Sequence, residues 1–388
     1  MRAARRGWSM GGAGLQENPL GESGWAHPLH ALVPRTCGLG AAAHLLGFIR
    51  YNAPLSLSGG NRSPWLMEKP HFRAALLHPR YWPTWLLFGL WYLLAQLPYR
   101  WQLALGRLLG RAMMRLAPSR RTIAERNLAL CFPEKSAAER NTLLRENFES
   151  NGIALMETGM AWFRSSRWLR DLFTIEGLEY LQAPAGRGQG VVMLAMHFTT
   201  LEIGAQFMSL CHPVDGMYRP HKNPVYDYMQ RKGRERHGDN TEVFQRKDVR
   251  GMLRALKRGR AVWYAPDQDY GIKQGVFAPL FGQPAATVTG TSRFARVGRA
   301  LVVPYTVTRL EQGAGYKVKV HPPIEEIPSG DELQDAVLVN QFVESRMREH
   351  PEQYMWVHRR FKTRPPDAPG IYDGVRKRKK KRRKKVAG

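Results

Sequence analysis

The chain contains few cysteines, and their arrangement excludes two kinds of stabilisation. Cys37, Cys131 and Cys211 are the only three among 388 residues. They form no CxxC pair and share no spacing with histidines that suits a zinc site. We therefore expect neither a disulfide framework nor a structural metal, and a reducing compartment fits this composition best.

Acidic residues are scarce relative to basic residues. The chain has 59 Lys and Arg residues against 32 Asp and Glu residues, a net charge of +27. Ten basic residues form the uninterrupted run 376–385, yet segment 67–374 still has 43 basic and 30 acidic residues, a net charge of +13. This excess favours polyanionic partners such as phospholipid, phosphorylated glycolipid, nucleic acid or an acidic carrier protein. Hydrophobic residues make up 43% of the chain, enough for a sizeable core, so a wholly disordered protein is excluded.

Composition divides the chain into four segments. Residues 1–66 lack a sustained hydrophobic period and are expected to be disordered or an extension outside the fold. We assign 67–118 to a membrane anchor with an amphipathic segment, 119–366 to the main domain and 367–388 to a disordered basic tail. Such a tail is typical of nucleic-acid binding and of adhesion to anionic membranes, and we favour the membrane.

The segment 81–99 is the clearest membrane signal. It has 19 residues without a charge, bounded by Arg80 and Arg100, which is just long enough to cross a bilayer. Aromatic residues near both ends are typical of an interfacial belt, whereas Pro83, Gln96 and Pro98 weaken a full crossing. We predict an anchoring helix, spanning or half-inserted, in preference to a buried core helix. Because arginines follow the segment, the main domain is expected on the cytoplasmic side.

Hydrophobic periodicity predicts an α/β domain. Apolar residues recur every three or four positions through 119–181, which indicates helices. After Gly190, the apolar runs 191–196, 261–265 and 301–307 predict buried strands, and 200–210 and 250–257 predict helices between them. Alternating strands and helices indicate parallel connections.

The junction at 196–202 carries the strongest candidates for chemistry. His197 directly follows the first predicted strand, where ligands bind in open α/β sheets. Its imidazole is suited to removing a proton from an alcohol, and Glu202, five positions later, is placed to orient the ring. Because the pair includes no serine or cysteine nucleophile, it indicates direct attack by a bound hydroxyl. The alternative is structural: Thr199 to Glu202 also fits a capping box, with His197 satisfying a strand-end hydrogen bond.

Several short blocks, in order along the chain, carry a resemblance to a known family. They are residues 76–82, 126–128, 131–134, 156–163, 218–220, 264–267, 269–271, 353–356 and 358–365. From about residue 67 to 366 the chain resembles the late lipid A acyltransferases, the lauroyl/myristoyl transferase family. The resemblance implies a glycerolipid-acyltransferase-like α/β fold, a mixed sheet flanked by helices, with an N-terminal membrane-anchoring helix.

The resemblance also implies a reaction and its residues. His197 and Glu202 match the catalytic H-x-x-x-x-(D/E) pair of the family, with His197 as general base. The implied reaction moves a fatty acyl chain from acyl carrier protein to a 3-hydroxyl of an acyl chain on a Kdo-bearing lipid A precursor at the bacterial inner membrane. Neither a metal nor a cofactor is expected beyond the acyl-carrier-protein co-substrate.

Further residues have candidate roles that the sequence leaves open. Arg234 matches a family arginine and would meet the oxyanion, bind a substrate phosphate, or belong to a solvated basic face. Asp267 matches a family aspartate at a strand end and would orient Arg234 or another base, or only form a turn. Phosphates, acidic sugars, lipid headgroups or the carrier are candidate ligands for Arg219, Arg359, Arg360, Lys362 and Arg364. Asn127 is either a substrate-site residue or a helix cap.

Two other functions compete with this prediction. A glycerophospholipid acyltransferase shares the His-acid pair, but that group carries an E-G-T-R block that the chain lacks. A membrane-tethered nucleic-acid-binding protein would use the basic tail, yet the chain has no aromatic-basic RNA motif of known spacing.

Overall fold

The computed structural model describes residues 70–237, 241–245 and 248–375. The expectations for residues 1–66 and for the basic run from Arg376 lie outside the described residues.

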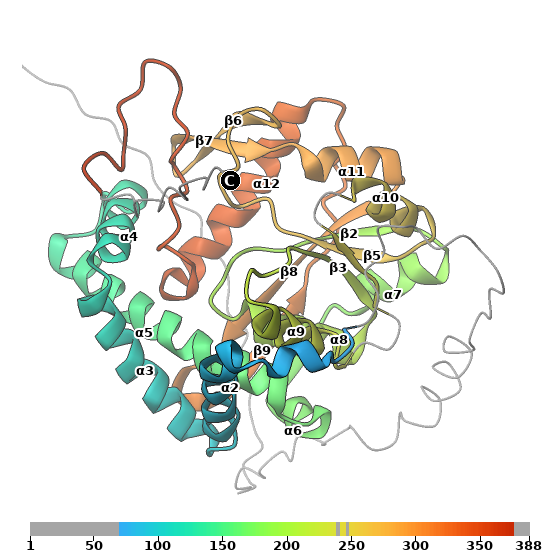
Figure 1. Cartoon of the computed structure of the whole chain (residues 1–388). Helices are drawn as coiled ribbons and strands as arrows, with labels where there is room; N and C mark the ends of the chain where they lie inside the picture. Colours follow the sequence, from blue (N-terminus) through green and yellow to red (C-terminus); the bar gives the residue numbers. More distant parts are fainter. Residues whose placement is uncertain (1–69, 238–240, 246–247, 376–388) are drawn as a thin grey trace, which may run out of the picture. The chain divides into compact units, whose positions relative to one another are not determined.

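A seven-stranded mixed sheet forms the centre of the fold, in the order β1-β9-β8-β2-β5-β3-β4 (Figure 1). The strands β8, β2, β5, β3 and β4 are parallel to one another, β9 is antiparallel to β8, and β1 is parallel to β9. A separate antiparallel hairpin of β6 and β7 packs against α12. The strands are β1 (Phe173–Glu176), β2 (Val191–Leu194), β3 (Val214–Tyr218), β4 (Val243–Gln245), β5 (Ala261–Tyr264), β6 (Gly275–Leu280), β7 (Gln283–Val288), β8 (Leu301–Arg309) and β9 (Tyr316–Val320).

Helices cover both faces of this sheet. They are α2 (Trp82–Ala95), α3 (Tyr99–Leu116), α4 (Pro118–Cys131), α5 (Ala137–Phe163), α6 (Ser166–Arg170), α7 (Glu179–Gly186), α8 (Leu201–Cys211), α9 (Pro224–Arg234), α10 (Val249–Lys257), α11 (Gly290–Gly298) and α12 (Glu332–Glu349). Short 3-10 turns lie at Ala74–Leu77, Pro79–Tyr81, Glu311–Gly313 and Pro351–Gln353.

The sequence of β2 explains its central position. All four of its side chains are buried, because the strand is paired on both edges and covered on both faces. Val192 and Leu194 belong to the core shared with α10, α11 and α12, whereas Val191 and Met193 belong to the core shared with α7 and α8. An uninterrupted apolar run is the pattern that such a strand requires, which confirms the prediction of buried strands at 191–196, 261–265 and 301–307.

Two predictions of secondary structure are wrong in part. The helical segment predicted through residue 181 ends at Arg170, and Phe173–Glu176 forms the edge strand β1, with alternating exposure. The uncharged stretch 81–99 is divided: α2 ends at Ala95 and a new helix begins at Tyr99. Among the described residues, no helix combines the length and the apolar character needed to cross a bilayer.

Candidate active site

The site lies where β2 and β5 end side by side. His197 follows β2 and Asp267 follows β5, and these strands are parallel neighbours. The carboxyl ends of parallel neighbours lie at the same edge of a sheet, so two residues 70 positions apart in the chain come into contact.

Asp267 holds both the backbone and the ring of His197. Its Oδ2 accepts a hydrogen bond from the His197 backbone N–H at 2.8 Å, and its Oδ1 lies 2.7 Å from His197 Nδ1. The Tyr354 hydroxyl donates to Oδ2 at 3.0 Å. The Asp267 carboxylate is fully buried, while 18% of the His197 side chain stays accessible. With Nδ1 bound to Asp267, the other ring nitrogen, Nε2, is the one available to a ligand in the cavity that His197 lines.

The two ionisable groups shift each other's pKa. Burial lowers the pKa of His197, but the charge of Asp267 and its hydrogen bond outweigh burial, and the pKa is raised. Burial raises the pKa of Asp267, but the charge of His197 and its hydrogen bonds outweigh it, and the pKa is lowered. The carboxylate therefore stays ionised and stabilises a protonated imidazole.

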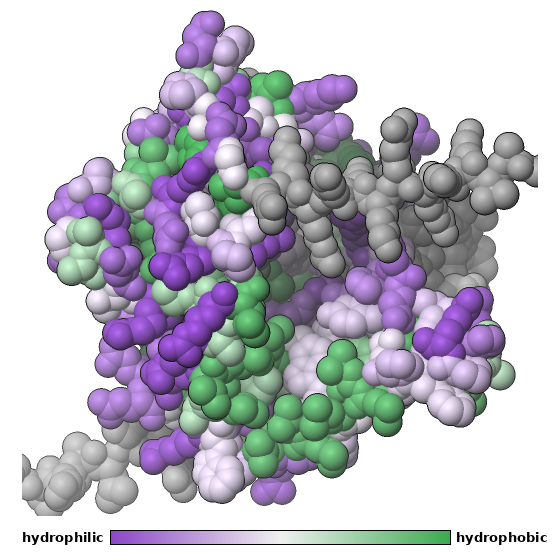
Figure 2. All heavy atoms as spheres, turned by 60° about the vertical axis from the view of Figure 1, so that its left-hand side comes forward, coloured by the Kyte–Doolittle hydropathy of each residue, from purple (hydrophilic) through white to green (hydrophobic). Residues whose placement is uncertain are grey.

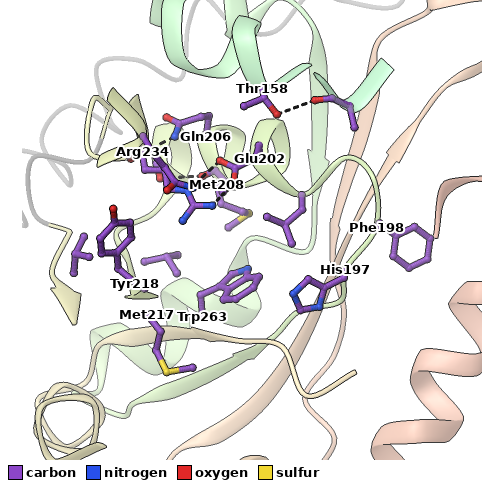
Figure 3. Close-up of a pocket in the computed structure, with 18 of the residues that line it drawn as sticks. Thr158, His197, Phe198, Glu202, Gln206, Met208, Met217, Tyr218, Arg234 and Trp263 are labelled. Carbon is purple, nitrogen blue, oxygen red and sulfur yellow. Dashed lines mark hydrogen bonds and ion pairs between the residues drawn. The ribbon is translucent and has the colours of Figure 1, made fainter. Parts of the chain in front are cut away.

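Glu202 has a different partner from the one predicted. Its carboxylate forms an ion pair with Arg234, with Arg234 Nε at 3.1 Å and a second bond from Nη2, and it accepts a hydrogen bond from Trp162 Nε1 at 3.3 Å. Figure 3 shows this pair on one side of the cavity and His197 on the other, with Trp263 between them. The orienting carboxylate of His197 is thus Asp267 and not Glu202. Asp267 was predicted to orient Arg234 or another base, and that base is His197.

The capping-box alternative for Glu202 is also wrong. The helix α8 begins at Leu201, and its cap residue Thr200 makes no side-chain capping bond. The Thr199 hydroxyl is 2.7 Å from the Ser150 hydroxyl, away from the first turn of the helix. Glu202 is therefore held by Arg234 and Trp162.

Arg234 has donors that suit an oxyanion, whereas four backbone N–H groups near His197 are already bonded. The backbone N–H groups of His197, Phe198, Thr199 and Leu201 all donate to protein acceptors. Arg234 lines the cavity and uses Nε and Nη2 for Glu202, which leaves other guanidinium N–H donors for a ligand.

The loop that carries His197 is anchored from behind by a buried ion pair that sequence reasoning missed. Arg309 donates from Nε and Nη2 to Glu157 at 2.6 and 2.8 Å, and from Nη1 to Ser150 at 2.9 Å. Ser150 is in turn bonded to Thr199. The two residues of this ion pair come from β8 and α5 and are 152 residues apart, so no local sequence pattern indicates that they pair.

The segment 353–356 is hydrogen-bonded to the same loop. Met355 N–H donates to the His197 carbonyl at 3.1 Å, Thr199 N–H donates to the Gln353 carbonyl at 2.7 Å, and Phe198 forms a β-bridge with Tyr354. Sequence reasoning used this segment only as a resemblance block; its position next to His197 explains why Tyr354 reaches Asp267.

An apolar cavity of about 660 Å³ opens beside His197 and the Glu202–Arg234 pair. Exposed Arg219 also lines it, and its role in substrate binding stays a prediction. Much of the remaining wall is apolar: Met193, Leu201, Met208, Val214, Met217 and Trp263. Such a lining, with a few polar groups at one place, suits a ligand with a long hydrocarbon part.

Other predicted substrate residues have structural roles instead. Asn127 is fully buried; its amide donates to the Trp356 and His358 carbonyls at 2.6 and 2.8 Å, and its oxygen accepts from Tyr372. It lies outside the cavity lining, which corrects its prediction as a substrate residue.

The basic cluster at 359–364 is likewise held by the protein. Arg360 is buried and donates to the Ala286 carbonyl and the Thr287 hydroxyl. Hydrogen bonds to protein oxygens are also made by Arg359, Lys362 and Arg364. These contacts fix the segment that follows residues 353–356. Arg360 is buried and makes structural contacts, whereas ligand binding by Arg359, Lys362 and Arg364 stays a prediction.

Comparisons with known proteins agree with this geometry. Residues 69–363 match the family described as bacterial lipid A biosynthesis acyltransferase. The chain is 45% identical over 304 residues to the lipid A biosynthesis lauroyltransferase of Escherichia coli K12, covering 78% of this chain and 99% of that protein. The chain belongs to the bacterial lipid A biosynthesis acyltransferase family.

Other relatives support the same assignment. The E. coli lipid A biosynthesis palmitoleoyltransferase is 42% identical over 302 residues, covering 78% of this chain and 98% of its own. The E. coli lipid A biosynthesis myristoyltransferase is 30% identical over 298 residues, covering 76% and 92%. The protein is therefore an acyltransferase, and within its described residues no three His, Cys, Asp or Glu side chains form a group that suits a metal ion.

Proposed function

We propose that this acyltransferase moves a fatty acyl chain from acyl carrier protein to a 3-hydroxyl of an acyl chain on a Kdo-bearing lipid A precursor. The observation that carries the proposal is the His197–Asp267 pair at the edge of an apolar cavity, in a chain of the lipid A acyltransferase family. The relatives are named for lauroyl, palmitoleoyl and myristoyl transfer, which supports a fatty acyl donor and a lipid A acceptor.

In the proposed reaction His197 is the general base. Nε2 takes the proton of the acceptor hydroxyl as its oxygen attacks the thioester carbonyl. The new C–O ester bond forms, the C–S bond breaks, and the carrier thiolate receives the proton from His197. Asp267 keeps Nδ1 protonated and stabilises the imidazolium that forms between these two steps.

The Glu202–Arg234 pair is proposed to act on the substrates and not on the base. Glu202 holds the guanidinium at the cavity wall, so that its remaining N–H donors meet the carbonyl oxygen or a phosphate of the lipid. The net positive charge of segment 67–374 suits both an acidic carrier protein and a phosphorylated lipid.

The place of action is proposed to be the cytoplasmic face of the inner membrane, with α2 and α3 lying on the lipid. Figure 2 shows a contiguous apolar area on the face that carries these helices, next to hydrophilic side chains. Several large apolar residues there are exposed, Leu86 by 74% and Leu116 by 83%. The exposed apolar residues of the two helices are Trp82, Leu86, Leu87, Leu90, Tyr92, Leu93, Trp101, Leu108 and Leu116. Arginines at the start and along α3 suit anionic headgroups.

A single-residue test separates the proposed base from the rest of the site. We expect His197→Ala to lower kcat for acyl transfer from acyl carrier protein by about a hundredfold or more, the usual range for loss of a general base. His71→Ala, at an exposed histidine, serves as the matched control and keeps wild-type turnover. Full activity of His197→Ala would overturn the mechanism, and mass spectrometry of lipid A from cells with each variant would identify the acyl group added.

A further inference from the structure

A second cavity lies next to the active-site cavity, between α2, α9 and the end of α5. Its volume is about 570 Å³. Half of its lining residues are aromatic, including buried Phe88 and Trp162, and two are cations, Lys232 and Arg236. The other lining residues are Trp85, Gly89, Tyr92, Phe163, Met229 and Gly233.

Trp162 and α9 separate this groove from the active-site cavity. Trp162 lines the groove, yet its Nε1 donates to Glu202, which lines the active-site cavity. Consecutive residues of α9 are divided in the same way: Gly233 lines the groove and Arg234 lines the active-site cavity. A Cβ at Gly233 would lie 2.4 Å from the Trp162 ring, so α9 packs directly on this side chain.

The cations of the groove are placed for an anion. Lys232 and Arg236 are exposed. Arg236 Nη1 donates to the Trp162 carbonyl at 2.9 Å, which holds the side chain against the aromatic wall, and Lys232 Nζ lies 5.6 Å from the Tyr228 ring. An aromatic and apolar groove with two cations among its lining residues suits a ligand in which a hydrocarbon chain is joined to a phosphate.

We propose that this groove binds a second acyl chain of the acceptor lipid, with a phosphate of that lipid at Lys232 and Arg236. The inference rests on the proposed function, because an acceptor with several acyl chains is what places one chain beside His197 and leaves another to be bound. One wall of the groove is formed by α2, the helix that also carries exposed apolar side chains.

Gly89 allows the groove to be blocked without disturbing the fold. A Cβ added at Gly89 meets no atom within 4 Å, so the substitution Gly89→Trp starts from open space beside the groove and is designed to fill it. Gly186, in the exposed last turn of α7, is equally open and gives the matched control Gly186→Trp.

The first measurement is photo-crosslinking of the full chain with a lysophosphatidate whose acyl chain carries a diazirine. We expect labelled peptides at Trp85, Phe163 and Met229. Labelling should fall about tenfold in Gly89→Trp, because the added ring occupies the space in which the acyl chain would be buried. Gly186→Trp is expected to label as wild type. Unchanged labelling in Gly89→Trp, or labels confined to other peptides, would overturn the proposal.

Two further labelling experiments distinguish the acceptor lipid from bulk membrane lipid and test whether the phosphate contributes to binding. The unlabelled phosphorylated, multiply acylated disaccharide should displace the probe, whereas excess phosphatidylglycerol should not; displacement by both alike would assign the groove to bulk lipid and overturn the acceptor. An uncharged monoacylglycerol probe that labels as strongly as lysophosphatidate would overturn the phosphate contact.

Kinetics then connect the groove with the reaction. Gly89→Trp should raise the KM for the acceptor by about tenfold and leave the KM for acyl carrier protein unchanged. Labelling should persist in His197→Ala, so a failure of the proposed base and a failure of the groove give different results.

Discussion

At the scale of single residues, the hydrogen bond from His197 Nδ1 to Asp267 decides what His197 can do. It occupies Nδ1, leaves Nε2 for the substrate and raises the pKa of the imidazole. A general base must be unprotonated, so activity rises as the pH rises through that pKa. The acidic limb of the pH profile therefore reports on Asp267 directly.

Replacement of this carboxylate has a predicted signature. Asp267→Asn removes the charge that raises the His197 pKa, so the acidic limb of kcat/KM should move to lower pH, while kcat falls by about a hundredfold or more because the tautomer is no longer fixed. Asp367→Asn, at an exposed aspartate, is the control. A loss of activity with an unmoved pH profile would mean that Asp267 only supports the fold.

The sequence predicted which residues belong to the site better than it predicted which of them contact one another. The strand-to-helix junction pointed to His197 and Glu202, and the resemblance added Arg234 and Asp267. Which acid faces which base depends on strand order: β5 lies next to β2, and this brings Asp267, not Glu202, to the ring. The Arg309–Glu157 pair was missed for the same reason, since its members approach only through the tertiary fold.

At the scale of elements, α3 and α5 pack with their backbones in close approach. A Cβ on Gly152 would lie 2.1 Å from the Gly106 carbonyl oxygen, and one on Gly110 would lie 2.1 Å from the Phe148 carbonyl oxygen. Only glycine fits at these contacts. These glycine contacts hold α3 against α5, which supplies Ser150, Glu157 and Trp162 to the site and to its supports.

This contact gives a prediction with an internal control. Gly152→Val should lower the free energy of unfolding by about 2–4 kcal/mol, because the added methyls meet backbone that cannot move aside without separating the helices. Gly89→Ala, a glycine in open space on α2, should raise it by about 0.5–1 kcal/mol through helix propensity. Denaturant unfolding in detergent measures both; equal effects would show that helix propensity, and not the close approach, governs these positions.

Elements buried on two faces were predicted best. Continuous apolar runs identified β2, β5 and β8, whereas β1, with one face exposed, was taken for part of a helix. The uncharged stretch 81–99 suggested one helix by composition, but Gln96 ends the first helix with a backbone bond to the Leu93 carbonyl, and Pro98 begins the next. Composition alone does not show where one helix ends and the next begins.

At the scale of the whole molecule, exposed apolar side chains on α2 and α3 define one side, and both cavities have α2, α5 or α9 in their walls. A lipid leaving the membrane at this side would meet the groove and the active-site cavity with little travel through water. The proposed membrane contact and the proposed acceptor groove thus both involve α2.

The proposed contact of α2 with the membrane can be tested without measuring catalysis. The double variant Leu86→Glu with Leu93→Glu should weaken binding to phosphatidylglycerol vesicles by about tenfold or more, since two exposed leucines lose their burial in lipid. Leu333→Glu changes an exposed leucine on α12 and should bind as wild type. Vesicle sedimentation measures the binding. An equal loss of binding in the double variant and in Leu333→Glu would contradict membrane contact through α2.

The sequence by itself determined the class of the protein. Apolar runs long enough for buried strands, a histidine at a strand end and ordered motif blocks are local properties, and they suffice for the α/β fold, the acyltransferase family and the identity of the base candidate. Tertiary structure alone decided the pairing: Asp267 with His197, Glu202 with Arg234, Asn127 and the 359–364 cluster in supporting contacts. The reason is physical, because hydrogen bonds and ion pairs act within about 3 Å, and strand order and helix packing determine which residues come that close.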